Sequence, residues 1–359
     1  MAVAAADPWR SLSDGDREQA QGPRRTDGRD CKRLLTPLER ALRERIRSDG
    51  PITLEAYMEA CNAYYYATRD PLGASGDFTT APEISQMFGE LVGACLADCW
   101  TRAGRPGKAI YAELGPGRGT LAADALRTMR MAGLEPPVHL VETSPVLREA
   151  QAQAVPGAIW HDSIDDLPQA PLTVVANEFF DALPVRQFVD GVERRVSVAA
   201  GGLAFDRDGQ VVEQSPARAE AAAALSGSIA TNGGVALVID YGHAKSAPGE
   251  TLQALHGHKF AAVLDRPGEQ DLTAHVDFEA LAEAARSAGA KASPVVTQGL
   301  WLERLGIAAR AASLARRHPD RTEEIAASHR RLCDPQEMGS LFKVMAIHAP
   351  EWPRPEGFE

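Results

Sequence analysis

Residues 109–120 constrain the fold more than any other part of this chain. An apolar run leads into Glu113-Leu114-Gly115-Pro116-Gly117-Arg118-Gly119-Thr120, and a helix-like segment follows at 121–126. Glycines permit positive φ and a close backbone approach, and the free N–H groups and dipole at a helix N-terminus attract an anionic or polar ligand. The sequence therefore predicts a strand, a glycine turn and a helix that together bind a nucleotide.

The spacing of these glycines narrows the class of ligand. The pattern is E-x-G-x-G-x-G, and Thr120 stands where the dinucleotide motif G-x-G-x-x-G has its last glycine. No Lys-Ser/Thr pair follows, which excludes a P-loop. The pattern resembles the first motif of class I S-adenosylmethionine-dependent methyltransferases. A glycine turn without a ligand is the alternative.

Composition excludes several classes of function. The chain has 359 residues and a net charge of −11, and no basic stripe is present to neutralise phosphates, so we expect no nucleic-acid partner. An acidic surface still attracts a basic protein or peptide. No apolar run approaches the ~20 residues of a membrane helix, so we expect no membrane insertion. Five cysteines without a C-x-x-C pair indicate free thiols in a reducing compartment.

The pattern of strands and helices predicts an α/β fold. Apolar strands alternate with helical segments and end in a final strand at 341–348, which is typical of a doubly wound, Rossmann-like sheet. The predicted strands cover 109–114, 138–142, 158–160, 172–177 and 235–242. Further helices are expected at 278–287 and 301–317.

Four regions are expected along the chain. Residues 1–33 form a disordered tail whose acidic residues argue against a mitochondrial transit peptide, so the expected location is the cytoplasm. Residues 34–105 form a helical N-terminal cap with a glycine-rich loop. Residues 106–349 form the core, with a β-rich insertion at about 185–232 that starts as a hairpin at 187–198 and ends in a helix at 216–226. Residues 350–359 form a tail.

The cap is expected to contain three helices. The first begins with Thr36 as the capping residue and Pro37 at the first position, and the second starts near Thr53. The third carries Pro82 in its first turn and shows a 3.6-residue period from 84 to 100. On this helix Gly89, Gly93 and Ala97 form a ridge of small residues, where another element can approach closely.

Ligands of a doubly wound sheet lie across the carboxyl ends of its strands. The turn of Gly115, Gly117, Gly119 and Thr120 is expected to face the methionine and ribose of the cofactor. Glu142 ends the second strand and can accept the ribose hydroxyls, or it caps the next helix. Asp162 and Ser163 follow the third strand and can bind the adenine amino group, or they form a local turn.

The fourth strand ends in the residues expected to receive the methyl acceptor, Asn177, Glu178 and Asp181. A sulfonium is already an activated electrophile, so the chemistry needs no metal. An arginine acceptor is charged at physiological pH and a poor nucleophile, so it needs carboxylates that grip its N–H groups. Glu178 and Asp181, one turn apart if helical, are the candidate catalytic residues. Their alternative role is to cap the following segment.

The loop before the third helix is unusually specific in composition. It contains Gly76, Asp77, Phe78, Thr79 and Thr80 and leads directly into that helix. We expect either a lid over the site that contacts the substrate or a simple connector.

The chain resembles the MidA family of protein arginine methyltransferases, which are tied in mitochondria to respiratory complex I assembly. The matching stretches extend from about 34 to 347. They lie at 76–90, 113–120, 177–184, 240–242, 275–278 and 338–344. The resemblance implies a class I methyltransferase fold, S-adenosyl-L-methionine as cofactor, and symmetric dimethylation of an arginine in a protein such as a complex I subunit. After Cys61 the chain is shorter than the family pattern, which affects the packing of the cap.

Three functions remain open at this point. The first is methyl transfer to an arginine of a partner protein. The second is a non-catalytic assembly factor that keeps the fold and uses the cap and the insertion as a binding surface. The third is methyl transfer to an amino group of a small molecule or nucleic acid, which an asparagine after the fourth strand also suits. The sequence predicts no oligomeric state.

Overall fold

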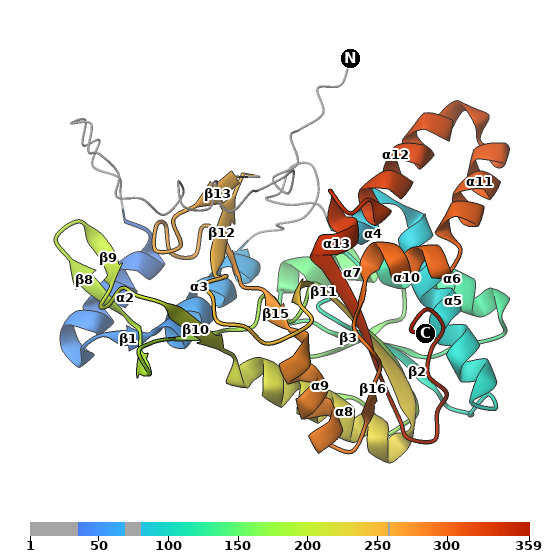
Figure 1. Ribbon diagram of the computed structural model, residues 1–359, viewed down its shortest axis with the longest axis horizontal. Helices are drawn as coiled ribbons and strands as arrows, with labels where there is room; N and C mark the ends of the chain where they lie inside the picture. The colour runs from blue at the N-terminus through green and yellow to red at the C-terminus, as the bar shows by residue number, and fades with distance from the viewer. Residues whose placement is uncertain (1–34, 69–79, 258) are drawn as a thin grey trace. The chain divides into compact units, whose positions relative to one another are not determined.

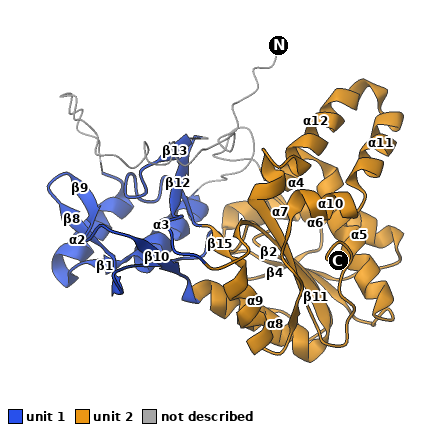
Figure 2. Cartoon of the chain, in the orientation of Figure 1, with its two compact units in different colours: residues 1–78, 182–216, 247–274 blue, residues 79–181, 217–246, 275–359 orange. Residues whose placement is uncertain are grey.

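A computed structural model of the protein describes residues 35–68, 80–257 and 259–359. The predicted tail at 1–33 and the loop residues 76–79 lie outside these ranges. The chain divides into two compact units, each assembled from three separate segments (Figure 2). Unit 1 takes residues 1–78, 182–216 and 247–274, and unit 2 takes the rest of the chain.

Unit 2 is built on the predicted doubly wound sheet. Its strands run in the order β16-β18-β11-β5-β2-β3-β4, with β18 antiparallel to β11. Every residue of β2 and β5 is buried, as expected of parallel strands covered on both faces. The bounds are β2 (Ile110–Leu114), β3 (Val138–Val141), β4 (Ile159–His161), β5 (Leu172–Asn177), β11 (Gly234–His243), β16 (Lys291–Ala292) and β18 (Phe342–His348), with short strands β15 (Val276–Asp277) and β17 (Val296–Thr297) at the side.

Helices cover both faces of this sheet. In Figure 1, α8 and α9 lie on one side, and α5 and α6 lie on the other. The helices of unit 2 are α4 (Ala81–Ile84), α5 (Gln86–Arg102), α6 (Thr120–Met131), α7 (Pro145–Ala154), α8 (Pro216–Asn232), α9 (Phe278–Ser287), α10 (Gln298–Arg304), α11 (Ile307–Arg317), α12 (Thr322–Cys333) and α13 (Met338–Leu341). Among the described residues, no helix combines the length and apolarity needed to cross a bilayer.

The small-residue ridge on α5 allows α6 to pack unusually close to it. A Cβ built on Gly93 would lie 2.4 Å from the Ala125 carbonyl oxygen, and one on Gly89 would lie 2.7 Å from the Asp124 Cβ. Both distances are too short for real atoms. The predicted close approach at this ridge is confirmed, and α6 is the approaching element.

Unit 1 has its own hydrophobic core, and its described residues form two helices and three small sheets. The core is formed by Leu42, Ile46, Ile52, Leu54, Tyr57, Met58, Cys61, Val185, Val196, Leu252, Ala254, Leu272 and Ala274. The helices are α2 (Pro37–Asp49), where the hydroxyl of Thr36 caps Glu39 as predicted, and α3 (Leu54–Thr68). The sheets are β1-β8-β9, β10-β6-β7 and β13-β12-β14.

The strands of unit 1 come from distant parts of the sequence. Their bounds are β1 (Ile52–Thr53), β6 (Arg186–Val189), β7 (Val192–Glu193), β8 (Arg195–Ala199), β9 (Gly202–Phe205), β10 (Val211–Gln214), β12 (Gln253–His256), β13 (Lys259–Ala261) and β14 (Asp271–Thr273). Strand β1 of the cap pairs with β8 of the insertion. The part of the cap up to α3, residues 182–216 of the insertion region and residues 247–274 therefore fold as one unit.

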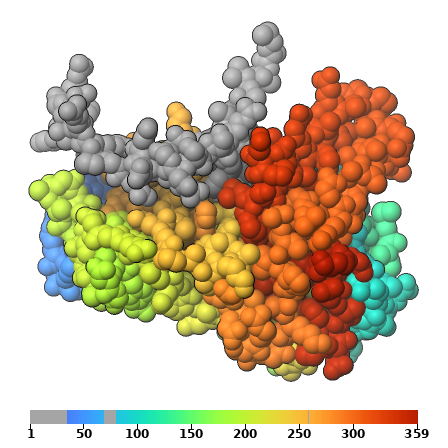
Figure 3. Space-filling model, viewed as in Figure 1, coloured from blue at the N-terminus to red at the C-terminus, as the bar shows by residue number. Residues whose placement is uncertain are grey.

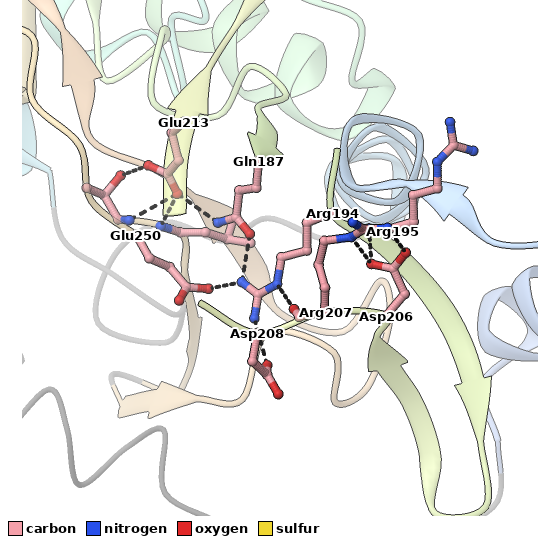
Figure 4. Close-up of polar contacts among 10 residues, drawn as sticks. Gln187, Arg194, Arg195, Asp206, Arg207, Asp208, Glu213 and Glu250 are labelled. Carbon is pink, nitrogen blue, oxygen red and sulfur yellow. Dashed lines mark hydrogen bonds and ion pairs between the residues drawn. The ribbon is translucent and has the colours of Figure 1, made fainter. Parts of the chain in front are cut away.

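The predicted hairpin at 187–198 is interrupted at Arg194, whose buried side chain turns inward (Figure 4). Its guanidinium lies 3.7 Å from the centre of the Phe205 ring and donates hydrogen bonds to Gln187 (2.9 Å) and Glu250 (2.5 Å). Glu213 accepts from Gln187 at 2.8 Å and from the Leu252 amide at 3.1 Å. Strand β7 ends at this polar network, and the following strand β8 pairs in a different sheet.

The compact units differ from the predicted regions in three places. Helices α4 and α5 belong to unit 2 rather than to the cap, and so do residues 217–232 of the insertion. Residues 350–359 pack on unit 2: Phe358 is fully buried, and the Cys99 thiol donates to the Pro353 carbonyl at 3.4 Å. Cys95 and Cys99 are buried free thiols, in agreement with the free thiols expected from the sequence.

Helix boundaries account for the other corrections. The predicted third cap helix is divided at Ser85, whose hydroxyl caps α5 by accepting from Met87, so Ile84 belongs to the separate α4. The predicted helix at 301–317 is divided at Gly306, which has φ +89°. Helix α8 continues to Asn232 instead of ending at 226, and α12 was not predicted.

The contact between α5 and α6 generates a first prediction. Gly93→Ala should lower the free energy of unfolding by about 1–3 kcal/mol, because the added methyl overpacks the helix pair. Gly227→Ala on α8 is the matched control: no atom of the described residues lies within 4 Å of its Cβ position, so it should stabilise the helix by about 0.5–1 kcal/mol. Urea denaturation of both variants measures the difference. Equal stabilisation by the two substitutions would show that α5 and α6 do not pack this closely.

Candidate functional site

The glycine turn after β2 has the backbone that its sequence predicts. Gly115, Gly117 and Gly119 have φ of +61°, +53° and +82°, and Gly119 is the left-handed residue that starts α6. A Cβ on Gly119 would lie 3.3 Å from the Ala154 Cβ of α7, and one on Gly115 would lie 3.2 Å from the Phe179 ring. The turn is therefore held between α7 and the loop that follows β5.

Gln151 of α7 joins three parts of this site and was missed at the sequence level. Its side chain is fully buried, and its amide donates to the Gly117 carbonyl at 2.7 Å and to the Glu142 carboxylate at 3.2 Å. Its carbonyl accepts from the Trp160 indole at 2.8 Å. Its position one turn after Leu147, on the inward face of α7, was the available signal.

Glu142 lies at the tip of β3, where it was predicted. Its carboxylate accepts from the Ser144 amide at 2.7 Å, whereas Ser144 itself caps α7 by accepting from the Leu147 amide. Burial raises its pKa, while hydrogen bonds from Ser144 and Gln151 act to lower it. A carboxylate accepts about four hydrogen bonds. This one can therefore hold the turn and still receive a ligand hydroxyl.

The other residues predicted to bind the cofactor form hydrogen bonds or ion pairs with side chains and backbone of this chain. The exposed Asp162 pairs with Arg148 at 2.6 Å. Ser163 caps the short helix η1 (Ile164–Asp166), as the predicted local turn requires. Thr120 donates its hydroxyl to Glu83 of α4 at 2.6 Å. Thr80, the one described residue of the predicted lid, immediately precedes α4 and is buried.

The acidic loop after β5, residues 178–181, is a series of bends and turns, so the helical spacing considered for Glu178 and Asp181 is wrong. Glu178 has φ +51°, a strained value for a residue with a side chain. The Asn177 amide donates to the Glu178 carboxylate at 3.2 Å. The Asn177 Oδ1 atom is buried without a hydrogen-bond partner in the described parts of the chain.

Asp240, near the carboxyl end of β11, binds the backbone of this loop. It is fully buried, and its carboxylate accepts from the amides of Phe180 and Asp181 at 3.1 Å each and of Tyr241 at 2.9 Å. Burial, followed by the charges of Asp181 and Glu178, raises its pKa well above the usual range. Sequence reasoning did not assign Asp240 to the site, although an acid at the end of an apolar strand beside β5 was a usable signal.

Arg218 of α8 donates hydrogen bonds to carbonyl groups of the same loop. It donates to the Phe180 carbonyl at 2.6 Å, the Asp181 carbonyl at 3.0 Å and the His275 carbonyl at 2.7 Å. Asp240 binds the loop amides and Arg218 its carbonyls, so the backbone that carries Glu178 and Asp181 is fixed from both directions. A rigid acidic site of this kind suits a cationic ligand.

Glu113, the acid that opens the glycine motif, is fully enclosed in β2. The Tyr111 hydroxyl donates to its carboxylate at 2.6 Å. Burial raises the pKa of Glu113 to about 8, although the hydrogen bond from Tyr111 lowers it. The group is therefore mostly protonated at neutral pH.

Comparisons with known proteins agree with this geometry. A family model described as "Putative S-adenosyl-L-methionine-dependent methyltransferase" matches residues 91–205 and 195–296. "Protein arginine methyltransferase NDUFAF7 homolog, mitochondrial" of Drosophila melanogaster is 37% identical, with 86% of this chain and 84% of that protein covered. The human protein arginine methyltransferase NDUFAF7 is 33% identical, with 87% and 83% covered.

A solved structure shares the fold over nearly the whole chain. A protein from Burkholderia thailandensis, titled a "likely methyl transferase" and bound to S-adenosyl-homocysteine, superposes with a TM-score of 0.77 at 26% identity. The match covers 91% of this chain and 96% of that one. The nucleoside is bound by that protein.

The raised pKa of Glu113 generates a prediction on stability. The unfolded chain ionises this group near 4.5 and the folded chain near 8, so its contribution to stability is complete below about pH 4.5 and is lost as the pH rises toward about 8. Glu113→Gln should remove up to about 1.4 kcal/mol per pH unit of that dependence. Urea denaturation across this range, with the exposed Glu149→Gln as control, measures it. Identical pH profiles for wild type and Glu113→Gln would contradict the assignment.

Proposed function

The chain belongs to the family of S-adenosyl-L-methionine-dependent methyltransferases that includes the MidA proteins, and we propose that it methylates an arginine side chain of a partner protein. The enzyme class and the cofactor follow from membership. The acceptor is our inference. It rests on one observation above others, the rigid acidic loop at the carboxyl ends of β5 and β11.

The residues around the glycine turn suit S-adenosyl-L-methionine. Gly115, Gly117 and Gly119 leave no side chain at the backbone they would present to the cofactor, and the start of α6 offers free N–H groups. We assign Glu142 to a ribose hydroxyl and Asp162, beyond β4, to the adenine edge. When bound, the cofactor supplies a methyl group already activated by its sulfonium.

The acidic loop supplies what an arginine acceptor requires. A guanidinium is cationic and a poor nucleophile, so the carboxylates of Glu178 and Asp181 would grip its N–H groups and localise a lone pair on one nitrogen. Asp240 and Arg218 keep both carboxylates in place and so reduce the reorganisation needed when the substrate binds. A carboxylate beside the reacting nitrogen can also accept the proton that this nitrogen gives up.

The relatives support a protein as substrate. Those at 32–37% identity are named protein arginine methyltransferases. The net charge of −11 favours approach of a basic peptide. Following the resemblance to the MidA family, we propose symmetric dimethylation and take a respiratory complex I subunit as the first candidate partner. The Asn177 oxygen, which has no hydrogen-bond partner among the described residues, also suits an amino group, so a small-molecule or nucleic-acid acceptor is an outcome to be tested.

The cofactor assignment predicts the effect of one substitution. Glu142→Ala should weaken binding of S-adenosyl-homocysteine about 10- to 100-fold, because a hydrogen bond to a charged acceptor contributes about 1.5–3 kcal/mol and each 1.4 kcal/mol is tenfold. Calorimetry measures the affinity, with Glu149→Ala on the exposed face of α7 as control. Unchanged binding by a folded Glu142→Ala variant would remove this residue from the cofactor site.

The acceptor assignment predicts a separation of binding from turnover. Glu178→Gln and Asp181→Asn should each retain S-adenosyl-homocysteine binding and lower arginine methylation by at least about 100-fold, the lower end of what a positioned acid–base group contributes. Labelled methyl transfer to the proteome of cells lacking the gene, read by mass spectrometry, measures turnover and identifies the substrate. Glu283→Gln, on the surface of α9, is the control.

Two outcomes would overturn this assignment. Retained arginine methylation in both variants would exclude Glu178 and Asp181 from the mechanism. Label found only in nucleic acid or small molecules would exclude a protein arginine as the acceptor.

A further inference from the structure

Helices α10 and α12 bring three metal-ligand side chains together, away from the groups used in methyl transfer. Glu303 comes from the end of α10, and His329 and Cys333 come from the last turns of α12. Their ligand atoms all lie within 4.8 Å of one another, and the His329 Nε2 atom is 2.7 Å from a Glu303 oxygen.

The sequence spacing places two of these ligands on one face of α12. Residues four apart in a helix lie one turn above each other, so His329 and Cys333 project in the same direction. Glu303 approaches from the facing helix. A nitrogen, a sulfur and a carboxylate oxygen are donors that Zn²⁺ binds in proteins. The 2.7 Å between the His329 Nε2 atom and the Glu303 oxygen is a hydrogen-bond distance, shorter than the roughly 3.3 Å between two ligands of a tetrahedral ion, so these two side chains have to move slightly apart to bind one. The thiolate argues against Mg²⁺ and Ca²⁺, which prefer oxygen ligands.

Close backbone packing fixes the positions of these ligands. A Cβ on Gly299 would lie 2.3 Å from the Cys333 carbonyl oxygen, and one on Gly339 would lie 2.0 Å from the same atom. Gln298 also donates to the Leu332 carbonyl at 3.0 Å. The end of α12, which carries Cys333, is thus packed tightly against α10 and α13.

We propose that Glu303, His329 and Cys333 bind one Zn²⁺ ion, with water as the fourth ligand, and that this ion links α10 to α12. The site uses none of the residues assigned to the cofactor or to the methyl acceptor. Its carboxylate and thiolate balance the charge of the ion, while His329 binds as the neutral imidazole.

Binding releases one proton. Burial and the nearby charge of Glu303 raise the pKa of the Cys333 thiol to about 12, so the sulfur carries its proton when no metal is present. When Zn²⁺ binds, the S–H bond breaks, a Zn–S bond forms and the proton leaves to solvent, with no change in oxidation state. The Glu303 and His329 side chains are 43% and 29% exposed, and α12 lies at the surface of unit 2, so an ion can reach the site (Figure 3).

Helix α12 is also connected to the glycine turn, through hydrogen bonds made by α4. Ser328, next to His329, donates to the Ile84 carbonyl of α4 at 3.4 Å. Glu83 of the same short helix accepts the hydroxyl of Thr120 at the start of α6. An ion that braces α12 therefore also supports the contact between α4 and α6.

Cobalt provides the most direct test, because a thiolate bound to tetrahedral Co²⁺ gives a charge-transfer band in the near ultraviolet. The full chain, titrated with Co²⁺, should show this band at one equivalent and lose it when Zn²⁺ is added. Cys333→Ser should abolish the band, and His329→Ala should weaken metal binding by more than about 100-fold, since even outer-shell partners contribute 10- to 100-fold.

Matched controls separate this site from other thiols and imidazoles. Cys31→Ser and the exposed His318→Ala should retain the band. Zn²⁺ should raise the melting temperature of the wild type but not of Cys333→Ser, and S-adenosyl-homocysteine binding shows that the variant is folded. Absence of the band in folded wild-type protein, or its persistence in Cys333→Ser, would overturn the proposal.

Discussion

The candidate acceptor site depends on the parallel pairing of β5 with β11. This pairing places the carboxyl ends of both strands at one edge, so that Asp240 near the carboxyl end of β11 binds the backbone of the loop that leaves β5. A single buried carboxylate can then accept several amides of that loop. Arg218 completes the arrangement by binding the carbonyls. The fold thus determines a rigid acidic site before any substrate contact is considered.

Much of this arrangement could be predicted from local sequence. Continuous apolar runs identify β2, β5 and β11, and the glycine spacing identifies the turn, because both depend on backbone geometry and burial that a few adjacent residues specify. The position of Glu142 at a strand tip follows from the same pattern. These elements match the structure closely.

Contacts between distant residues could not be predicted in this way. Arg194 breaks a hairpin because its guanidinium is satisfied by Glu250, 56 residues further along the chain. Arg218 lies in an alanine-rich helix with no local sign that it reaches back to Phe180. Gln151 is buried because Gly117 and Trp160 provide its partners. The role of such a polar side chain can be recognised only once the fold is known, because its hydrogen-bond partner lies elsewhere in the sequence.

The same long-range contacts offset the unfavourable conformation and burial found at the acidic loop. Left-handed backbone at Glu178 and the burial of Asp240 are both unfavourable by themselves, by about 1–3 kcal/mol for the backbone alone. Nearby negative charges raise the pKa of Asp240 further. An incoming guanidinium would relieve that repulsion, since a cation favours the ionised form of every carboxyl around it.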